Sequence, residues 1–312
     1  MMSKNIFAII IIGLALSIWS CEQPYTPPVN EDEQELVVEG YIEAGDETNP
    51  TFVLVTRSLP FVTEVDAAAF EKLFISDAIV TVNDGSNLVT LTPLCLKDLP
   101  EEIRKQAATV LGIDPNNTTI NICAYIDLFD QIDRKLGGKY DLNVKVGSQL
   151  LTASTTIPNF VGVDSFRWAQ PPGEPSDTLA QLLVTITDPV GKNYYRYLTQ
   201  INDENLIAPF TSVTDDAFFD GKNFEFPLQK AERRTADLDP NTFGLFLRGD
   251  SVTVKWATID KAHFDFWNTR DNAANSGGPF SSYIRIKTNI TGGQGIWGGY
   301  AVGYYRLKCP EL

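Results

Sequence analysis

Residues 78–91 read AIVTVNDGSNLVTL. Two alternating runs, 78–82 and 88–91, flank Asn83-Asp84-Gly85, three residues that tolerate a positive backbone φ angle. Alternation of apolar and polar residues is typical of a strand with one buried face, and a turn between two such runs predicts a β-hairpin. This hairpin sets the expectation for the whole chain, which is an all-β fold.

The same period of two recurs on both sides of the hairpin. Residues 36–42 and 51–55 alternate before it, and residues 140–146 and 150–157 alternate after it. About seven short strands with turn signals between them predict an immunoglobulin-like or fibronectin-like β-sandwich. We place this first domain at residues 35–158.

Alternation continues to the C-terminal end of the chain. Residues 182–187, 194–201, 251–259 and 297–307 are strand-like, and residues 283–287 are a further candidate. Asp260 predicts the N-cap of a short helix between two of them. Residues 159–312 are therefore expected to form a second, larger β-sandwich with a short helix.

A helical insertion interrupts the first sandwich at residues 94–123. Asp98 can cap a helix, Glu101 and Glu102 suit its first turn, and Gly112 follows its last turn. These signals predict a short helix over about residues 99–111.

The N-terminus determines where the protein works. Residues 6–18 are an almost continuous apolar core after Lys4, shorter than the ~20 residues of a membrane-spanning helix, and Cys21 follows closely. This pattern predicts a signal peptide over residues 1–20 and a lipid-modified Cys21. An ordinary cleaved signal and an uncleaved anchor are the alternatives, because Trp19 is bulky where a lipobox has a small residue. Proline-rich residues 21–34 are expected to form a tether.

Four cysteines are present, and lipid modification of Cys21 would leave three of them available for a disulfide. Cys95 and Cys123 flank the helical insertion, and a disulfide between them would stabilise its loop by about 3 kcal/mol. A pairing that uses Cys309 is the alternative. Metal binding by these cysteines is disfavoured, because no CxxC spacing or neighbouring histidine accompanies them.

Charge excludes one class of partner. The formal net charge is -15, from 40 acidic and 25 basic residues. Such an acidic chain is not expected to bind nucleic acid or anionic lipid through a basic patch. Contact with the membrane is expected through the N-terminal lipid.

A glycine-rich segment stands near the C-terminus. Residues 289–300 read NITGGQGIWGGY. The glycines allow close backbone approach, so we expect tight packing, with Ile296, Trp297 and Tyr300 filling the second core. A phosphate cradle is the alternative, but the Lys-Ser/Thr of a P-loop does not follow.

This segment resembles the closing motif of a family of Bacteroidota lipoproteins, domain of unknown function 4249. The stretches LVVEG (36–40), TIP (156–158) and GDSV (249–252) agree with the family's pattern, and the cysteine-flanked insertion departs from it. The resemblance implies an outer-membrane lipoprotein, commonly encoded beside a TonB-dependent receptor, with no established chemistry.

Enzyme chemistry finds little support in the sequence. His263 is the only histidine, and its predicted amphipathic helix suggests an ordinary packed or surface residue and not a catalytic one. Gly-x-Ser-x-Gly is absent, so no elbow serine is indicated, although a glycosidase carboxylate pair is defined only in space. Asp215, Asp216 and Asp220 suggest either a solvated turn or a calcium site. We expect a non-enzymatic protein without a cofactor.

Two further features concern the surface. Trp168 and Trp267 are candidate platforms for a sugar or peptide, with burial in a core as the alternative. Thr178, in an Asp-Thr-Leu sequence, is a candidate O-glycosylation site, whereas Ser251 in a similar sequence is expected to begin a strand.

The leading functional expectation is an accessory subunit of a TonB-dependent receptor or a related outer-membrane transport or assembly complex, bound to a β-barrel partner. The alternative is an independent surface lipoprotein that binds a glycan or peptide. Both are lipid-anchored in the outer membrane, and the sequence leaves open which face carries the protein.

Overall fold

The computed structural model describes residues 34–59, 67–110, 121–234, 238–276 and 284–311. All helices and strands given below belong to one unit of residues 35–58 and 65–312. The predicted signal peptide, lipidated Cys21 and the tether up to residue 33 lie outside the described residues.

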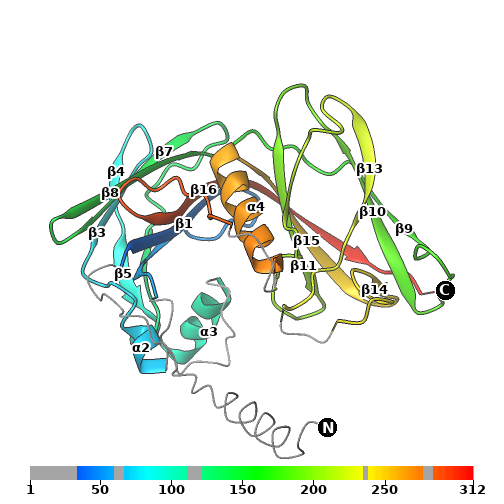
Figure 1. The fold of residues 1–312 in the computed structure, drawn as a ribbon, viewed down its shortest axis with the longest axis horizontal. Coiled ribbons are helices and arrows are strands. Elements are labelled where there is room, and N and C mark those ends of the chain that lie inside the picture. Colours follow the sequence, from blue (N-terminus) through cyan, green and yellow to red (C-terminus); the bar gives the residue numbers. More distant parts are fainter. Residues whose placement is uncertain (1–33, 60–66, 111–120, 235–237, 277–283, 312) are drawn as a thin grey trace, which may run out of the picture. The chain divides into compact units, whose positions relative to one another are not determined.

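Strands dominate the fold, which confirms the all-β prediction, and they form three sheets (Figure 1). In order across the eight-stranded sheet, the strands are β12 (Val213–Asp215), β11 (Tyr194–Ile201), β15 (Ser251–Ile259), β16 (Gln294–Lys308), β1 (Leu36–Gly45), β2 (Phe52–Arg57), β6 (Cys123–Ile126) and β5 (Thr92–Cys95). A second sheet consists of β4 (Leu88–Thr90), β3 (Ile79–Asn83), β7 (Lys139–Val146) and β8 (Gln149–Thr156). The third consists of β13 (Asn223–Leu228), β10 (Leu179–Thr187) and β14 (Phe246–Leu247), with β9 (Ser165–Ala169) also paired to β10.

Short helices accompany these sheets. They are α2 (Ala67–Glu71), the 3-10 helix η2 (Leu96–Asp98), α3 (Glu101–Val110) and α4 (Lys261–Asn275). The sequence predicts α3 and α4 but not α2. Among the described residues, no helix has both the length and the apolar character needed to cross a membrane.

The hairpin of residues 78–91 forms as predicted. Strands β3 and β4 pair in antiparallel fashion, with Asn83 opposite Leu88. Asp84 Oδ1 accepts hydrogen bonds from the backbone N–H groups of Ser86 (2.8 Å) and Asn87 (2.6 Å), and Gly85 has a φ of 89°. The turn therefore depends on an Asx-type contact and on one glycine in a conformation that side chains disfavour.

The two ends of the fold meet inside the largest sheet. Strand β1 pairs in parallel with β16, with Val37 opposite Gln294, whereas its other neighbour, β2, is antiparallel. Most residues of the first core precede the predicted boundary between residues 158 and 159 and those of the second core follow it, but Ile290, Trp297 and Ala301 also belong to the first core. However, both halves contribute strands to the eight-stranded sheet, so the sheet crosses this boundary.

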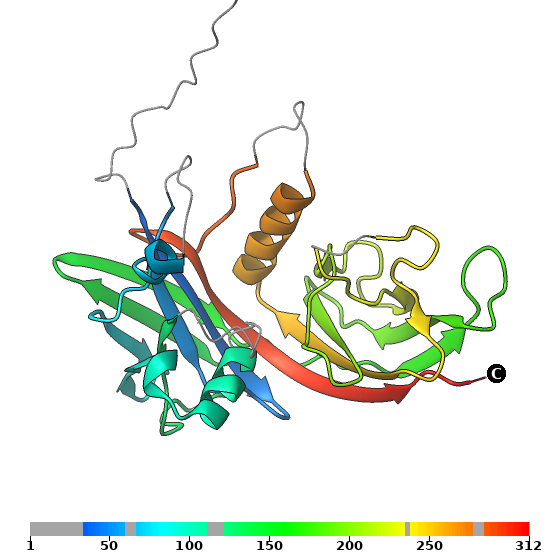
Figure 2. The ribbon, with the colours of Figure 1, turned by 90° about the horizontal axis from the view of Figure 1, so that it is seen from below.

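Each core lies between one small sheet and part of the eight-stranded sheet. The first contains the buried aromatic residues Tyr125, Tyr140 and Trp297, and the second contains Tyr195, Phe246 and Trp256. All six are at most 1% exposed, and burial of each large apolar side chain contributes about 1.5–3 kcal/mol. Strand β16 contributes residues to the first core and packs against the second, and the ribbon shows it as one long strand between β1 and β15 (Figures 1 and 2).

The opposite face of the eight-stranded sheet carries α4. Successive side chains of a strand point to opposite faces, so Ala301 lies in the first core while Tyr300 and Val302 join a separate cluster with Trp267 of α4. Asp260 caps this helix as predicted, because its Oδ1 accepts a 2.8 Å hydrogen bond from the N–H of His263.

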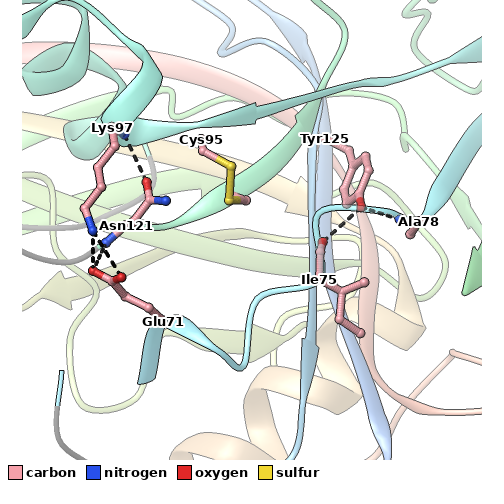
Figure 3. The surroundings of a disulfide bond; sticks show 8 residues. Glu71, Ile75, Ala78, Cys95, Lys97, Asn121 and Tyr125 are labelled. Atoms are coloured by element: carbon pink, nitrogen blue, oxygen red, sulfur yellow. Dashed lines mark hydrogen bonds and ion pairs between the residues drawn. A yellow bond between two sulfur atoms is a disulfide. The ribbon is translucent and has the colours of Figure 1, made fainter. Parts of the chain in front are cut away.

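The insertion widens the eight-stranded sheet. Strands β5 and β6 flank it and pair with each other, and the disulfide Cys95–Cys123 joins them (Figure 3). Next to the disulfide, Lys97 Nζ lies 2.9 Å from Glu71 Oε1, and the same carboxylate oxygen accepts the N–H of Asn121 at 2.8 Å (Figure 3). These contacts tie the insertion to α2.

The predicted strand at residues 283–287 is wrong for its described part. Residues 284–287 form no strand. The N–H of Lys287 donates instead to Thr269 Oγ1 of α4 at 3.0 Å, so this segment finds a partner on the helix and not in a sheet.

Candidate functional site

A polar cavity opens on the face of the eight-stranded sheet that lies opposite the two cores. We call it the Arg196 pocket. It has a volume of about 340 Å³, and its principal residues are Glu39, Tyr41 and Glu43 of β1, Arg196 of β11, Lys255 of β15 and Tyr300 of β16. Trp267 of α4 also lines it. Cavities that combine apolar walls with a few convergent polar groups are typical of ligand sites.

One pair of charges in the pocket is complete. Lys255 Nζ lies 2.5 Å from Glu43 Oε1, and both side chains are 8% exposed. Glu43 Oε2 accepts a further hydrogen bond, at 3.1 Å, from the N–H of Asn49. Burial lowers the pKa of Lys255, but the Glu43 carboxylate outweighs burial, so this pKa lies above its ordinary value. Lys255 is therefore a charged ammonium held by its carboxylate.

Arg196 differs, because it has a buried charge without an anionic partner. The residue is 5% exposed, and among the described residues no carboxylate lies within ion-pair distance of it. Its guanidinium carbon lies 3.6 Å from the ring centroid of Trp267, and Nη1 donates to the Tyr300 hydroxyl. Nε is buried and has no partner among the described residues.

His263 lies beneath the pocket in a fully packed environment. Its ring meets Tyr300 edge-on at 4.3 Å between centroids and stacks with Tyr41 at 5.7 Å. Burial, followed by the nearby Arg196 charge, lowers the pKa of His263 well below its ordinary value. The imidazole is therefore neutral at pH 7, and of the packed and surface positions that the sequence left open, the structure shows the packed one.

The glycine-rich segment brings β16 close to its neighbours. A Cβ on Gly298 would lie 2.7 Å from His263 Nδ1, and one on Gly299 would lie 2.5 Å from the carbonyl oxygen of Thr156. Gly295 has a φ of 111°, and a Cβ there would lie 1.9 Å from the carbonyl oxygen of Val38. This geometry confirms a packing role for the segment.

The predicted destination of its aromatic residues is wrong. Trp297 fills the first core, and Tyr300 lies on the pocket face, whereas the sequence suggested the second core for both. The reason is the parallel pairing of β16 with β1, which places the first half of β16 beside the N-terminal strands.

The two predicted tryptophan platforms lie in different clusters. Trp267 lines the pocket, but Arg196 lies 3.6 Å and Arg270 5.2 Å from its ring centroid. Trp168 is half-buried in β9 and meets Phe246 edge-on at 5.4 Å, at the margin of the second core. The structure therefore does not join them into one aromatic surface.

The candidate modification site is accessible. Thr178 is exposed and directly precedes β10, so O-glycosylation of this residue stays a prediction. Ser251, the weaker candidate, is the first residue of β15, as expected. The disulfide joins Cys95 and Cys123, as predicted. Cys309, which the alternative pairing would have used, is buried and free.

An acidic cluster forms where the sequence suggested one, with a change of membership. Carboxylate oxygens of Asp188, Asp216 and Asp220 lie within 4.8 Å of one another, and Asp215 is not in the group. Asp216 accepts from Lys192 Nζ at 2.7 Å and from the N–H of Asn193 at 2.6 Å.

The other members of the cluster also have donors. Asp188 accepts from the Tyr195 hydroxyl and, at 3.0 Å, from the N–H of Gly221. Asp220 accepts the N–H of Gly191 at 2.9 Å. The cluster thus joins two loops, and a calcium ion there would compete with Lys192 for Asp216.

Three residues of the pocket, Glu43, Arg196 and Lys255, were not predicted from the sequence. A signal was present, because Arg196 lies in the strand YYRYLTQI and Lys255 in the strand SVTVKWATI, both otherwise rich in apolar and aromatic residues. Charges inside such strands indicate a second, polar face. The ion-pair partner of Lys255 could not be predicted, since Glu43 lies in a strand from the opposite end of the chain.

Fold and site together define a class, a β-sandwich protein with two cores, one shared sheet and a ligand-sized pocket on the face of that sheet that carries α4. The chain belongs to the family described as Domain of unknown function (DUF4249), whose model matches residues 22–306. This confirms the resemblance at the level of the domain family. No curated protein and no solved structure matches the chain.

Proposed function

We propose that this protein is a non-enzymatic, lipid-anchored protein of the Bacteroidota outer membrane that binds a small ligand in the Arg196 pocket. The observation that carries the binding role is the buried Arg196 without an anionic partner in a cavity of about 340 Å³. The membrane location rests on the apolar residues 6–18 and on Cys21. The implied family location supports the same placement.

The volume of the Arg196 pocket limits the size of the ligand that it can hold. At ~30 Å³ for each water in the liquid, the cavity equals about eleven water molecules, near the lower end of ligand pockets. A monosaccharide or an amino acid is of this size. This size is compatible with the alternative expectation from the sequence, a glycan or peptide ligand, if one unit of it enters the pocket.

Equilibrium dialysis against a mixture of compounds tests ligand binding and identifies the ligand in one step. The mature protein, purified in mild detergent, is dialysed against a mixture of sugars, sugar acids, amino acids and dipeptides, and enriched compounds are identified by mass spectrometry. A Leu198→Trp variant serves as the control, because Leu198 lines the pocket and a larger side chain would fill it. We expect a compound that the wild type enriches and the variant does not. Equal profiles for two folded proteins would refute ligand binding in this pocket.

Lipid anchoring has a separate test. Cells that express the wild type or Cys21→Ser are labelled with radioactive palmitate and fractionated. We expect label and outer-membrane recovery for the wild type and loss of both for the variant. A labelled Cys21→Ser protein would contradict the assignment.

The second candidate function is that of an accessory subunit of a TonB-dependent receptor or related complex. An apolar groove of about 340 Å³ between α3 and strands β5 and β6 favours it. Ile103 and Leu128 line this groove and are 50% and 46% exposed, so a protein partner would bury apolar surface there. The expected occupant is the β-barrel partner that the family resemblance implies.

Affinity isolation tests this role. Outer membranes are extracted with mild detergent, and the protein is recovered through a C-terminal tag together with its partners. We expect a stoichiometric β-barrel protein that Ile103→Asp loses and Leu88→Asp keeps, because Leu88 is 67% exposed and lies outside the groove. Recovery of the wild-type protein alone would rule out a stable complex.

A further inference from the structure

Arg196 is a buried cation, and no carboxylate of the described residues offsets the free-energy cost of removing its charge from water. A guanidinium has five N–H donors, and among the described residues Nη1 alone donates a hydrogen bond, to the Tyr300 hydroxyl. Its cation–π contact with Trp267 offsets part of the lost hydration, but an aromatic ring supplies no full negative charge. A buried charge without a partner is costly, and an apolar side chain of similar volume is often at least as stable.

The other charges of the pocket leave Arg196 free to bind an anion. Lys255 is already neutralised by Glu43 at 2.5 Å. Glu39 also lines the pocket and accepts a 2.9 Å hydrogen bond from the Tyr41 hydroxyl. Arg196 is therefore the one cation among the principal pocket residues described above that has no carboxylate partner.

The chemistry of the guanidinium and its neighbours selects the anion. A guanidinium fork fits the planar oxygen pair of a carboxylate, and such pairs are frequently bidentate. A phosphate dianion would carry more charge into a cavity that already contains the carboxylates of Glu39 and Glu43. A single negative charge is therefore favoured over a double one.

The remaining walls suit the body of an organic molecule. Phe52 and Leu54 of β2 supply apolar surface, and Asn205 and Gln200 supply amide groups. The Gln200 amide nitrogen donates to the Glu204 carbonyl at 2.6 Å, which leaves its oxygen to accept from a ligand hydroxyl or amide. A ligand with an apolar or ring-shaped body and several polar groups matches this lining.

We infer that the Arg196 pocket binds a small organic monocarboxylate, whose carboxylate pairs with the Arg196 guanidinium. This inference rests on the proposed ligand-binding function and specifies the ligand's chemical class. Sugar acids and amino acids or peptide ends share this chemistry, and matched probes distinguish the two sources.

Calorimetric titration of the mature protein tests the inference with two pairs of probes. The first pair is D-glucuronate and D-glucose, and the second is N-acetyl-L-leucine and its amide, so each pair differs in one negative charge. We expect the acid of one pair to bind at least tenfold more tightly than its neutral partner. The pair that responds identifies the source of the carboxylate.

Variants tie that binding to Arg196. Arg196→Met should weaken it at least tenfold, and Arg196→Lys should weaken it less, because lysine keeps the charge but lacks the fork. Arg233→Met is the matched control, since Arg233 is an exposed arginine outside the pocket, and it should bind like the wild type. Thermal unfolding of each variant confirms that it is folded.

Contrary results separate the inference from the function on which it rests. If dialysis yields a neutral ligand that Leu198→Trp loses, ligand binding stands and the carboxylate inference is overturned. Acid binding that survives in both Arg196 variants overturns it as well. If neither dialysis nor titration finds any ligand, both the proposed ligand-binding function and the carboxylate inference are refuted.

Discussion

Two groups of buried charges in this protein differ in how their charges are balanced. In the acidic cluster, Asp188 and Asp216 are almost fully buried, yet each accepts hydrogen bonds from two donors. In the Arg196 pocket, Lys255 and Glu43 satisfy each other, but Arg196 has no carboxylate partner among the described residues. The first group is complete within the chain, and the second is incomplete.

The comparison shows why burial of a charge does not by itself mark a functional site. Structural charges are accounted for by donors and acceptors of the same chain, as they are for Asp216. A group that remains without a partner requires another explanation. On this criterion we assign the acidic cluster to the fold and Arg196 to a ligand, and the following predictions concern the two groups and their surroundings.

The largest effect is expected for Glu43→Gln, which leaves the Lys255 ammonium buried without a carboxylate. Removal of one partner of a buried pair typically costs about 3 kcal/mol or more of unfolding free energy. Urea denaturation measures this loss. Glu47→Gln is the control, because Glu47 pairs with Arg306 at the surface, where solvent screens the pair, so its loss should change stability far less.

A double variant shows whether the loss arises from the orphaned lysine. Lys255→Met combined with Glu43→Gln should recover most of the stability, since neither charge then remains. A loss for Glu43→Gln no greater than that for Glu47→Gln would mean that this pair does not belong among the structural charges.

Asp216→Ala should have the next largest effect. It removes the acceptor for Lys192 Nζ and for the N–H of Asn193, and we expect a loss of about 2 kcal/mol of unfolding free energy. Asp203→Ala is the control, because Asp203 is exposed and its removal should change stability by about 0.5 kcal/mol or less. Equal stability of the two variants would contradict the structural role of the cluster.

Mild acid should destabilise the protein through His263, which is packed beneath the Arg196 pocket. The folded-state pKa of His263 lies below its ordinary value, so the unfolded chain takes up this proton first as the pH falls. Stability should fall by about 1 kcal/mol between pH 7 and pH 5.5, given an unfolded pKa near 6.5.

The measurement is urea denaturation at a series of pH values. His263 is the only histidine of the chain, so His263→Gln should remove most of the dependence in this range. An unchanged pH dependence in that variant would show that other groups are responsible.

Arg196→Met is expected to have the smallest effect on stability, within about 1 kcal/mol of the wild type, because it removes an uncompensated charge along with a cation–π contact. Urea denaturation in the absence of ligand measures it. A loss of about 3 kcal/mol would place Arg196 with the structural charges and remove the contrast between the two groups.

Local sequence patterns were sufficient for much of the fold. The hairpin at Asn83-Asp84-Gly85, the capped helix after Asp260 and the cysteine-flanked insertion all follow from residues close in sequence. The parallel pairing of β1 with β16 does not, because alternation reveals a strand but not its neighbour. That one pairing explains why the aromatic residues of β16 occupy a different core from the expected one.

The candidate site was harder to predict than the fold, because its contacts join residues that are far apart in the sequence. Glu43 and Lys255 form their ion pair across 212 positions of the sequence. Trp267 was predicted as a candidate for binding, but its contact with Arg196 depends on how α4 lies against β11. The acidic cluster contains Asp188 in place of the predicted Asp215, and this member was missed because Asp188 comes from a different loop. Alternation could have indicated that Arg196 faces away from the core, but not what surrounds it.

The parallel pairing of β1 and β16 also has a kinetic consequence. A chain synthesised from its N-terminus cannot complete the eight-stranded sheet until the 15 residues of β16 have been made. Until then one edge of β1 offers unpaired backbone groups, a state prone to aggregation. Closure must also bring together distant parts of the chain, which slows folding. The final step of assembly is therefore expected to follow synthesis of the last strand, and the Arg196 pocket, which takes Tyr300 from that strand, forms in the same step.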